Sequence, residues 1–315
     1  MKKETLTTRI VFIIFRVIPL KVRRALFKAL AVLFYRFSEK HRLIVLHNLT
    51  RAFPEKDISE LVKIARDCYR SLGILAAEFF DILLMTRENI SDWLEFEGRE
   101  NYLRAKEKNK GILYFTGHFG NWELEAAAFA ILCEPLNIVY RVLDNPVIGD
   151  IVDKVRSHRG NRLVHKGGAV KKILEILRKN EIVGILIDQN VSWREGVFVD
   201  FFGRPASTTK GLAALTLQTG APVLPGFISR MKDGKYRFVI EPEVEISRTG
   251  DYDRDIFENT QRFTKIVEDN VRRHPEQWFW LHQRWKTKKS QIPANKRQGF
   301  KGVRDNVYRS SKSTT

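Results

Sequence analysis

This chain of 315 residues has few cysteines, no long hydrophobic run and a shortage of acidic residues. Only Cys68 and Cys133 occur, and neither has metal-ligand spacing around it. This excludes a disulfide framework and a cysteine-based zinc site, and it fits a reducing compartment. We therefore expect neither a metal ion nor a cofactor.

The shortage of acidic residues gives a net charge of +18, which is concentrated at the two ends. Residues 1–30 hold eight basic residues and one acidic residue, and residues 286–315 hold nine basic residues and one acidic residue. The 255 residues between them carry only +3. We expect residues 287–315 to form a basic, disordered tail. Such a tail allows a nucleic-acid-binding alternative, but no zinc-finger spacing or RNA-binding motif supports it, so we expect no nucleic-acid partner.

The absence of a long hydrophobic run argues against a membrane-spanning helix at the N-terminal end. Ile10–Phe15 is apolar but stops at Arg16, far short of the roughly 20 residues that span a bilayer. Ala25–Phe37 mixes Lys and Arg with bulky apolar residues at helical spacing, which favours a helix lying on a membrane surface. We predict such an anchor over residues 1–40. Two alternatives are packing of this stripe on the core and a tilted span over residues 6–33. No signal-peptide cleavage site follows.

Between the two ends, apolar runs of strand length alternate with helical patterns. This alternation predicts an α/β domain over residues 41–286, with a largely parallel sheet flanked by helices. We find no internal repeat or interdomain linker. The expected helices cover residues 57–84, 99–108, 122–133, 147–158, 168–179, 208–219 and 253–273, and the expected strands cover 93–96, 111–117, 137–142, 162–165, 182–187, 197–201, 222–229 and 236–241.

The segment Gly111–Glu125 places a histidine, His118, in a glycine-flanked turn after a buried strand, with Glu123 five residues later. Five residues of regular helix turn by roughly 500°, so the two side chains meet only if His118 lies in the turn and Glu123 in the first helical turn. A histidine held by a carboxylate is poised to act as a general base on a hydroxyl. Glu125 competes for the carboxylate role.

Short motifs elsewhere carry a family resemblance from about Arg42 to Lys286. They are HNLTRAFPE (47–55), HFGNWE (118–123), YRVLDNP (140–146), DQN (188–190), FFGRPAST (201–208), TGAPVLP (219–225) and HPEQWFWLHQRWK (274–286). In this order and spacing, the chain resembles the lipid A biosynthesis lauroyl/myristoyl acyltransferases. This lysophospholipid-acyltransferase-like family also includes phosphatidylinositol mannoside acyltransferases.

The resemblance implies transfer of an acyl chain from an acyl carrier protein or coenzyme A thioester to a hydroxyl of a lipid A precursor. It places residues 41–286 as the acyltransferase domain, working at the cytoplasmic face of the inner membrane. Another glycolipid acceptor, such as a phosphatidylinositol mannoside, is the alternative within the enzyme class. A basic lipid- or nucleic-acid-binding protein is the non-enzymatic alternative.

Within this chemistry, the further candidate residues are for substrate binding. Backbone N–H groups near Gly120 and Asn121 are expected to stabilise the oxyanion of the tetrahedral intermediate. Arg141 is expected to bind that oxygen or a lipid phosphate, although a surface ion pair is the alternative. Asp188 ends an apolar strand and is expected to hold Arg141 or the acceptor sugar, or to have a role in a turn.

The resemblance implies two further surfaces. A basic cluster is a candidate dock for an acidic acyl carrier protein, with a solvated helix face or a lipid contact as the alternative. It consists of Lys154, Arg156, Arg159, Arg162, Lys166, Lys171 and Lys172. An apolar slot for the acyl chain is expected among Trp122, Phe129, Phe201 and Phe202, which are otherwise core residues.

Overall fold

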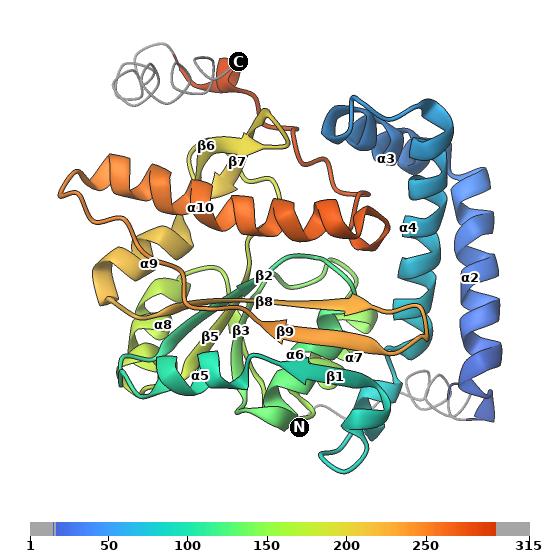
Figure 1. Cartoon of the computed structure of the whole chain (residues 1–315), viewed down its shortest axis with the longest axis horizontal. Coiled ribbons are helices and arrows are strands. Elements are labelled where there is room, and N and C mark those ends of the chain that lie inside the picture. The colour runs from blue at the N-terminus through green and yellow to red at the C-terminus, as the bar shows by residue number, and fades with distance from the viewer. Residues whose placement is uncertain (1–14, 16, 294–315) are drawn as a thin grey trace.

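The computed structural model describes residue 15 and residues 17–293 (Figure 1). Most of the predicted anchor's first half (residues 1–14 and 16) and most of the predicted basic tail (residues 294–315) therefore lie outside the described residues.

The described chain alternates helices with strands, as the sequence pattern predicts. The helices are α2 (Leu20–Phe37), α3 (Glu39–Ala52), α4 (Ile58–Glu78), α5 (Arg99–Lys106), α6 (Trp122–Leu132), α7 (Pro146–Ser157), α8 (Ala169–Arg178), α9 (Gly211–Thr219) and α10 (Tyr252–Arg273). The strands are β1 (Leu94–Glu97), β2 (Ile112–Thr116), β3 (Leu136–Tyr140), β4 (Arg162–His165), β5 (Ile182–Leu186), β6 (Gly196–Phe201), β7 (Arg204–Thr209), β8 (Val223–Arg230) and β9 (Tyr236–Ile240).

A seven-stranded, mostly parallel sheet forms the centre, in the order β1-β9-β8-β2-β5-β3-β4. Only the β8–β9 pair is antiparallel. The prediction of a largely parallel α/β sheet is confirmed. The pattern missed β7, which pairs with β6 in a separate hairpin. Residues 208 and 209 therefore end a strand, and the helix expected from 208 begins at Gly211.

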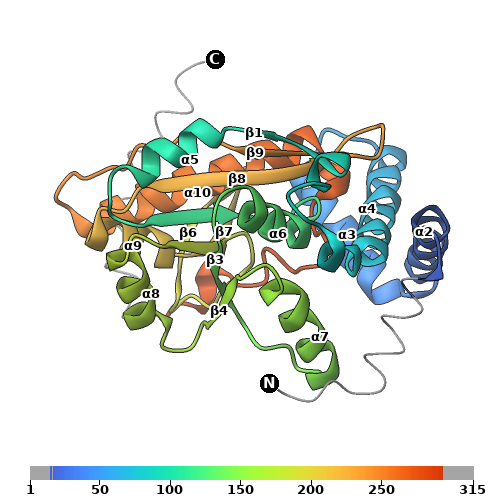
Figure 2. The same ribbon diagram turned by 90° about the horizontal axis from the view of Figure 1, so that it is seen from below.

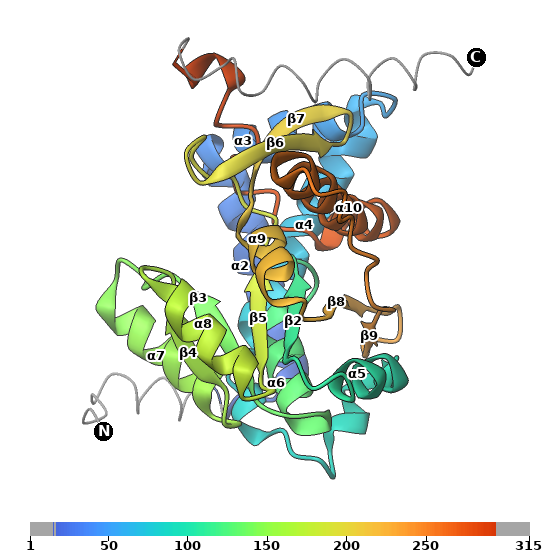
Figure 3. The same ribbon diagram turned by 90° about the vertical axis from the view of Figure 1, so that its left-hand side faces the viewer.

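Apolar side chains cover both faces of the sheet, because a parallel sheet is buried on both sides. One core joins Leu113 and Phe115 of β2 to side chains from α3, α4, α8, α9 and α10. The other joins Ile112 and Tyr114 to side chains from α5 and α6 and to Val155 of α7. Figure 3 shows α9 and α10 on one side of β2, β5 and β8, with α5 and α6 on the other.

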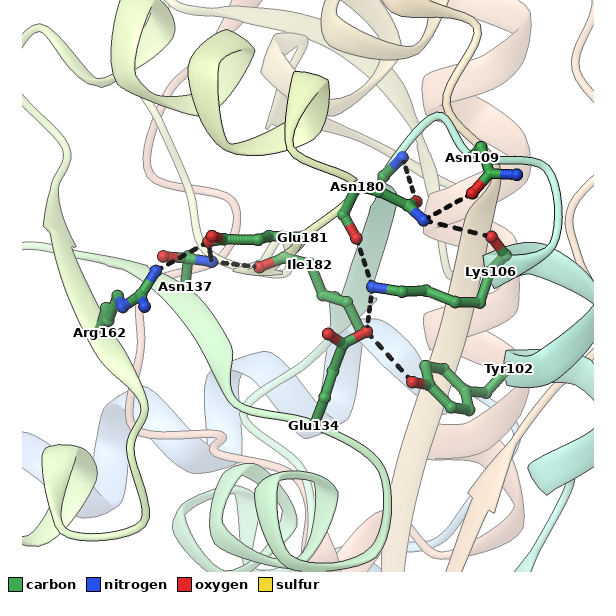
Figure 4. Close-up of polar contacts among 10 residues, drawn as sticks. Tyr102, Lys106, Asn109, Glu134, Asn137, Arg162, Asn180, Glu181 and Ile182 are labelled. Atoms are coloured by element: carbon green, nitrogen blue, oxygen red, sulfur yellow. Dashed lines mark hydrogen bonds and ion pairs between the residues drawn. The ribbon is translucent and has the colours of Figure 1, made fainter.

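The amino-terminal edge of the sheet is closed by a polar network (Figure 4). Tyr102 and Lys106 of α5 both donate to Glu134, and Lys106 also reaches the carbonyl of Asn180. On the neighbouring strands, Asn137 and Arg162 both donate to Glu181, at 3.1 and 2.9 Å. These groups satisfy one another, so we interpret this edge as structural.

Helix α2 is the outermost element and packs against α4 (Figure 2). Two ion pairs fix it: Arg23 donates to both oxygens of Asp81 (2.6 and 2.9 Å), and Arg24 donates to the fully buried Glu78 (2.7 Å). The opposite face of α2 is apolar and exposed. None of the described helices is long and apolar enough to cross a bilayer.

Candidate active site

Strand order brings His118 to Asp188. Strands β2 and β5 are parallel neighbours, with Thr116 opposite Leu186. His118 and Asp188 each follow two residues after these positions, and they lie side by side at the carboxyl edge of the sheet. Open α/β sheets commonly place their functional groups at this edge.

The His118 imidazole is held by Asp188. Its Nδ1 lies 2.8 Å from Asp188 Oδ1, while the backbone N–H of His118 and the indole of Trp278 each donate to Oδ2 at 2.7 Å. Burial alone would raise the pKa of Asp188, but the charge and hydrogen bonds of His118, together with the Trp278 bond, lower it to about 2. Asp188 is therefore ionised, so Nδ1 carries the proton and Nε2 is left as an acceptor.

The structure corrects the expected contact between Glu123 and His118. Glu123 instead forms a two-bond ion pair with Arg156 of α7, at 2.8 and 2.6 Å, and also accepts from the indole of Trp122 (3.1 Å). The Trp122 ring packs edge-on against the His118 ring. Glu123 lies in the first turn of α6, and its side chain is directed to α7 rather than back to His118. Among the described residues, Trp122 links Glu123 to His118.

Glu125, the competing carboxylate, is also turned away from His118. It is 1 % exposed and accepts from Tyr114 (2.5 Å) and Thr116 (3.2 Å) on β2. Burial outweighs these bonds and raises its pKa to about 8. At neutral pH the carboxyl is protonated, and it is part of the buried packing between α6 and β2.

Gly120 and Asn121 shape the turn between β2 and α6. Gly120 has φ +58°, and a Cβ there would lie 1.7 Å from the carbonyl oxygen of Ile228, so only glycine fits. Its N–H donates to the carbonyl of Gln277 at 2.8 Å, which corrects the expectation that this group is a free oxyanion donor. Asn121 is 1 % exposed and caps α6 by accepting from Leu124 N.

Arg141 does not lie against His118 in this structure. It sits in the exposed loop after β3, where its side chain is 72 % exposed and faces Asp144 at 3.4 Å. The expected Arg141–Asp188 contact is not made, because the carboxylate oxygens of Asp188 are hydrogen-bonded to His118 and Trp278.

The basic cluster and the aromatic set are both dispersed. Three members of the cluster form ion pairs: Arg156 with Glu123, Arg162 with Glu181 and Lys166 with Glu195. The cluster is therefore not one free cationic surface. Of the four candidate aromatics, Trp122 packs against His118, while Phe129, Phe201 and Phe202 are core residues.

Sequence reasoning missed two neighbours of His118 that the quoted motifs contain. Gln189, from the DQN motif, places its amide nitrogen 3.3 Å from His118 Nε2. Trp278, from the HPEQWFWLHQRWK motif, pairs with Phe119 in an isolated β-bridge as well as donating to Asp188. In the same motif, His282 accepts from the N–H of Asn190 at 2.6 Å. The available signals were the DQN motif after β5 and the motif after α10.

The arrangement provides an oriented, partly exposed imidazole at the carboxyl edge of a parallel sheet, with Nδ1 held by Asp188 and Nε2 contacted by the Gln189 amide. This is the geometry of a general base that removes a proton from a hydroxyl. Among the described residues, no group of three His, Cys, Asp or Glu side chains is placed to hold a metal ion.

Comparison with known proteins identifies the family of this chain. The family model for the bacterial lipid A biosynthesis acyltransferases matches residues 5–287. The lipid A biosynthesis lauroyltransferase of Escherichia coli K12 is 31% identical over 261 residues, covering 82% of this chain and 83% of the relative. The palmitoleoyltransferase of the same strain is 29% identical over 254 residues, covering 80% and 81%. The myristoyltransferase is 24% identical over 272 residues, covering 86% and 83%. This chain therefore belongs to the bacterial lipid A biosynthesis acyltransferases, and it is an acyltransferase.

Proposed function

We propose that this enzyme moves a fatty acyl chain from an acyl carrier protein or coenzyme A thioester to a hydroxyl of a lipid A precursor, at the cytoplasmic face of the inner membrane. The observation that carries the proposal is the His118–Asp188 pair at the carboxyl edge of the sheet, in a chain of this family.

In the proposed step, the acceptor oxygen attacks the thioester carbonyl while His118 Nε2 takes its proton. The C–S bond then breaks, and the imidazolium returns the proton to the leaving thiolate. Asp188 keeps the proton on Nδ1 and offsets the charge on the ring. The Gln189 amide occupies the place beside Nε2 that the acceptor hydroxyl must take, so this side chain moves aside when substrate binds.

The oxyanion of the tetrahedral intermediate is assigned to the first turn of α6, whose N-terminus directly follows the His118 turn. Because Phe119 and Gly120 use their N–H groups within the fold, the donors are assigned to the N–H groups of Asn121, Trp122 and Glu123. Both acidic side chains of this turn are neutralised, Glu123 by Arg156 and Glu125 by its own proton. The helix terminus therefore keeps its positive character.

Membrane binding is assigned to the exposed apolar stripe of α2. Its side chains recur every three or four residues and are 46–75% exposed: Val22, Leu26, Leu30, Leu33 and Phe37. The exposed Lys21, Lys28 and Arg36 lie on the same helix, each worth roughly 1 kcal/mol near anionic lipid. This pattern supports a helix lying in the headgroup layer.

The direct test of the chemistry is His118→Ala. We expect the initial rate of acyl transfer to fall by at least about 10²-fold. Because the change also leaves the buried Asp188 carboxylate without its imidazole partner, near-ultraviolet circular dichroism checks that the variant folds. The assay measures acyl gain on the lipid A precursor by mass spectrometry. Retention of more than about a tenth of the activity would rule out His118 as the base.

A further inference from the structure

A cationic cavity of about 460 Å³ lies between helix α3 and residues 283–288. Figure 1 shows the chain after α10 passing between α3 and the β6–β7 hairpin. Arg51 and His47 of α3 line the cavity on one side, and Lys286 and Lys288 on the other. None of its described lining residues is acidic.

The cations of this cavity differ from the paired cations elsewhere on the surface. Within the part of the chain that the structure describes, Arg51, Lys286 and Lys288 form no ion pair with a carboxylate, whereas Arg162 and Lys166 elsewhere do. Burial, followed by the charges of Arg51 and its neighbour Arg204, lowers the pKa of His47. Several positive charges around one concavity attract an anion.

The cavity is also partly apolar. Leu43 on its α3 wall is 56 % exposed, and Trp285 forms a buried part of its lining. The indole nitrogen of Trp285 is buried with no hydrogen-bond partner among the described residues. Helix α3 directly follows α2, whose exposed stripe ends at Phe37. A ligand that is both anionic and attached to apolar chains matches this combination.

The cavity wall is tied to the active-site loop. Thr287 and Asn190 exchange two hydrogen bonds, Thr287 N to Asn190 Oδ1 at 3.1 Å and Asn190 Nδ2 to Thr287 Oγ1 at 3.0 Å. Asn190 is the residue after Gln189, which contacts His118. Thr287, between the lining residues Lys286 and Lys288, therefore links the cavity wall to the segment that contacts His118.

We propose that this cavity binds a phosphate group of the membrane-embedded glycolipid acceptor and thereby positions its hydroxyl at His118. The planar fork of Arg51 suits two oxygens of a phosphate, and Lys286 and Lys288 add compact positive charges. The inference rests on the proposed acylation of a glycolipid, and it adds how this acceptor is held.

The test measures binding without turnover. Full-length protein carrying His118→Ala is floated with phosphatidylcholine vesicles that contain either a monophosphorylated disaccharide lipid or the same lipid after phosphatase treatment. The cavity variant adds Arg51→Gln and Lys286→Gln. The matched control adds Lys171→Gln and Lys172→Gln, which remove the same charge from exposed positions on α8. Near-ultraviolet circular dichroism checks that both variants fold.

We expect the parent protein and the α8 control to prefer the phosphorylated lipid, and the cavity variant to lose at least about tenfold of that preference. An unchanged preference in the cavity variant, or an equal loss in the α8 control, would overturn the proposal.

In the protein with His118 intact, the KM for the acyl thioester should not change. A rise in that KM with unaltered lipid binding would assign the cavity to a phosphate of the donor and overturn the proposal. Full activity of His118→Ala would refute the proposed mechanism while leaving the flotation result valid, so the two failures are distinguishable.

Discussion

The substitution Asp188→Asn separates the observed His118–Asp188 pair from a mechanism centred on Glu123. Asp188 accepts three hydrogen bonds: two on Oδ2, from His118 N and Trp278 Nε1, and one on Oδ1, from the imidazole. An asparagine can keep only one oxygen at this position. Its NH₂ group must face either the two N–H donors or the imidazole Nδ1.

The count of donors decides the orientation. Directing the NH₂ group at His118 N and Trp278 Nε1 leaves two buried donors unpaired, at about 1–3 kcal/mol each. Directing it at Nδ1 avoids that cost but forces the ring proton onto Nε2. The imidazole then has no free acceptor for the substrate hydroxyl. The equivalent change in the serine protease triad lowers kcat by about 10⁴, or roughly 5 kcal/mol of barrier, and we expect a loss of that order.

Initial rates of acyl transfer measure the loss, and ¹⁵N chemical shifts of the His118 ring report which nitrogen carries the proton. Thermal unfolding of the variant controls for misfolding. A rate loss smaller than about tenfold, or a ring that still carries its proton on Nδ1, would refute the reasoning.

Three other predictions follow from the same structure. Glu123→Gln should leave the tautomer of the His118 ring unchanged but lower the free energy of unfolding by about 3 kcal/mol, because it leaves Arg156 without its carboxylate partner. A shifted His118 tautomer in NMR would contradict this prediction. In the unchanged protein, the free energy of unfolding should fall by about 1.4 kcal/mol per pH unit as the pH rises from about 5 to about 8, because the buried Glu125 carboxyl keeps its proton only in the folded state. Glu125→Gln should remove this fall. Denaturant unfolding of both proteins at several pH values measures the difference, and parallel curves would contradict the prediction. Replacing Leu26, Leu30 and Leu33 of α2, which are about half exposed, with Gln should weaken vesicle binding by about 100-fold, at about 1 kcal/mol for each side chain. Val170→Gln on α8 should leave vesicle binding unchanged. Equal binding of both variants in flotation would contradict the α2 assignment.

Most of the sheet could be predicted from local pattern. Short apolar runs such as Ile112–Phe115 and Ile182–Ile187 are buried on both faces, and their composition alone indicates strands. The hairpin strand β7 was missed because Thr208 and Thr209 are typical of helix caps, and its pairing with β6 is a tertiary contact. Helix α3 was not predicted for a related reason: its polar and apolar residues give only a weak helical pattern, and packing on α4 decides it.

The sequence by itself determined which side chains reach the carboxyl edge of the sheet, because His118 and Asp188 each follow an apolar strand. Only the tertiary structure decided that these two meet. Sequence spacing favours Glu123, five residues from His118, but the helical turn directs that side chain to Arg156 on the next helix. The partner comes instead from 70 residues away, because β5 lies beside β2, and Trp278 is added from 90 residues beyond Asp188. Strand order arises from the packing of whole faces, which no local pattern encodes.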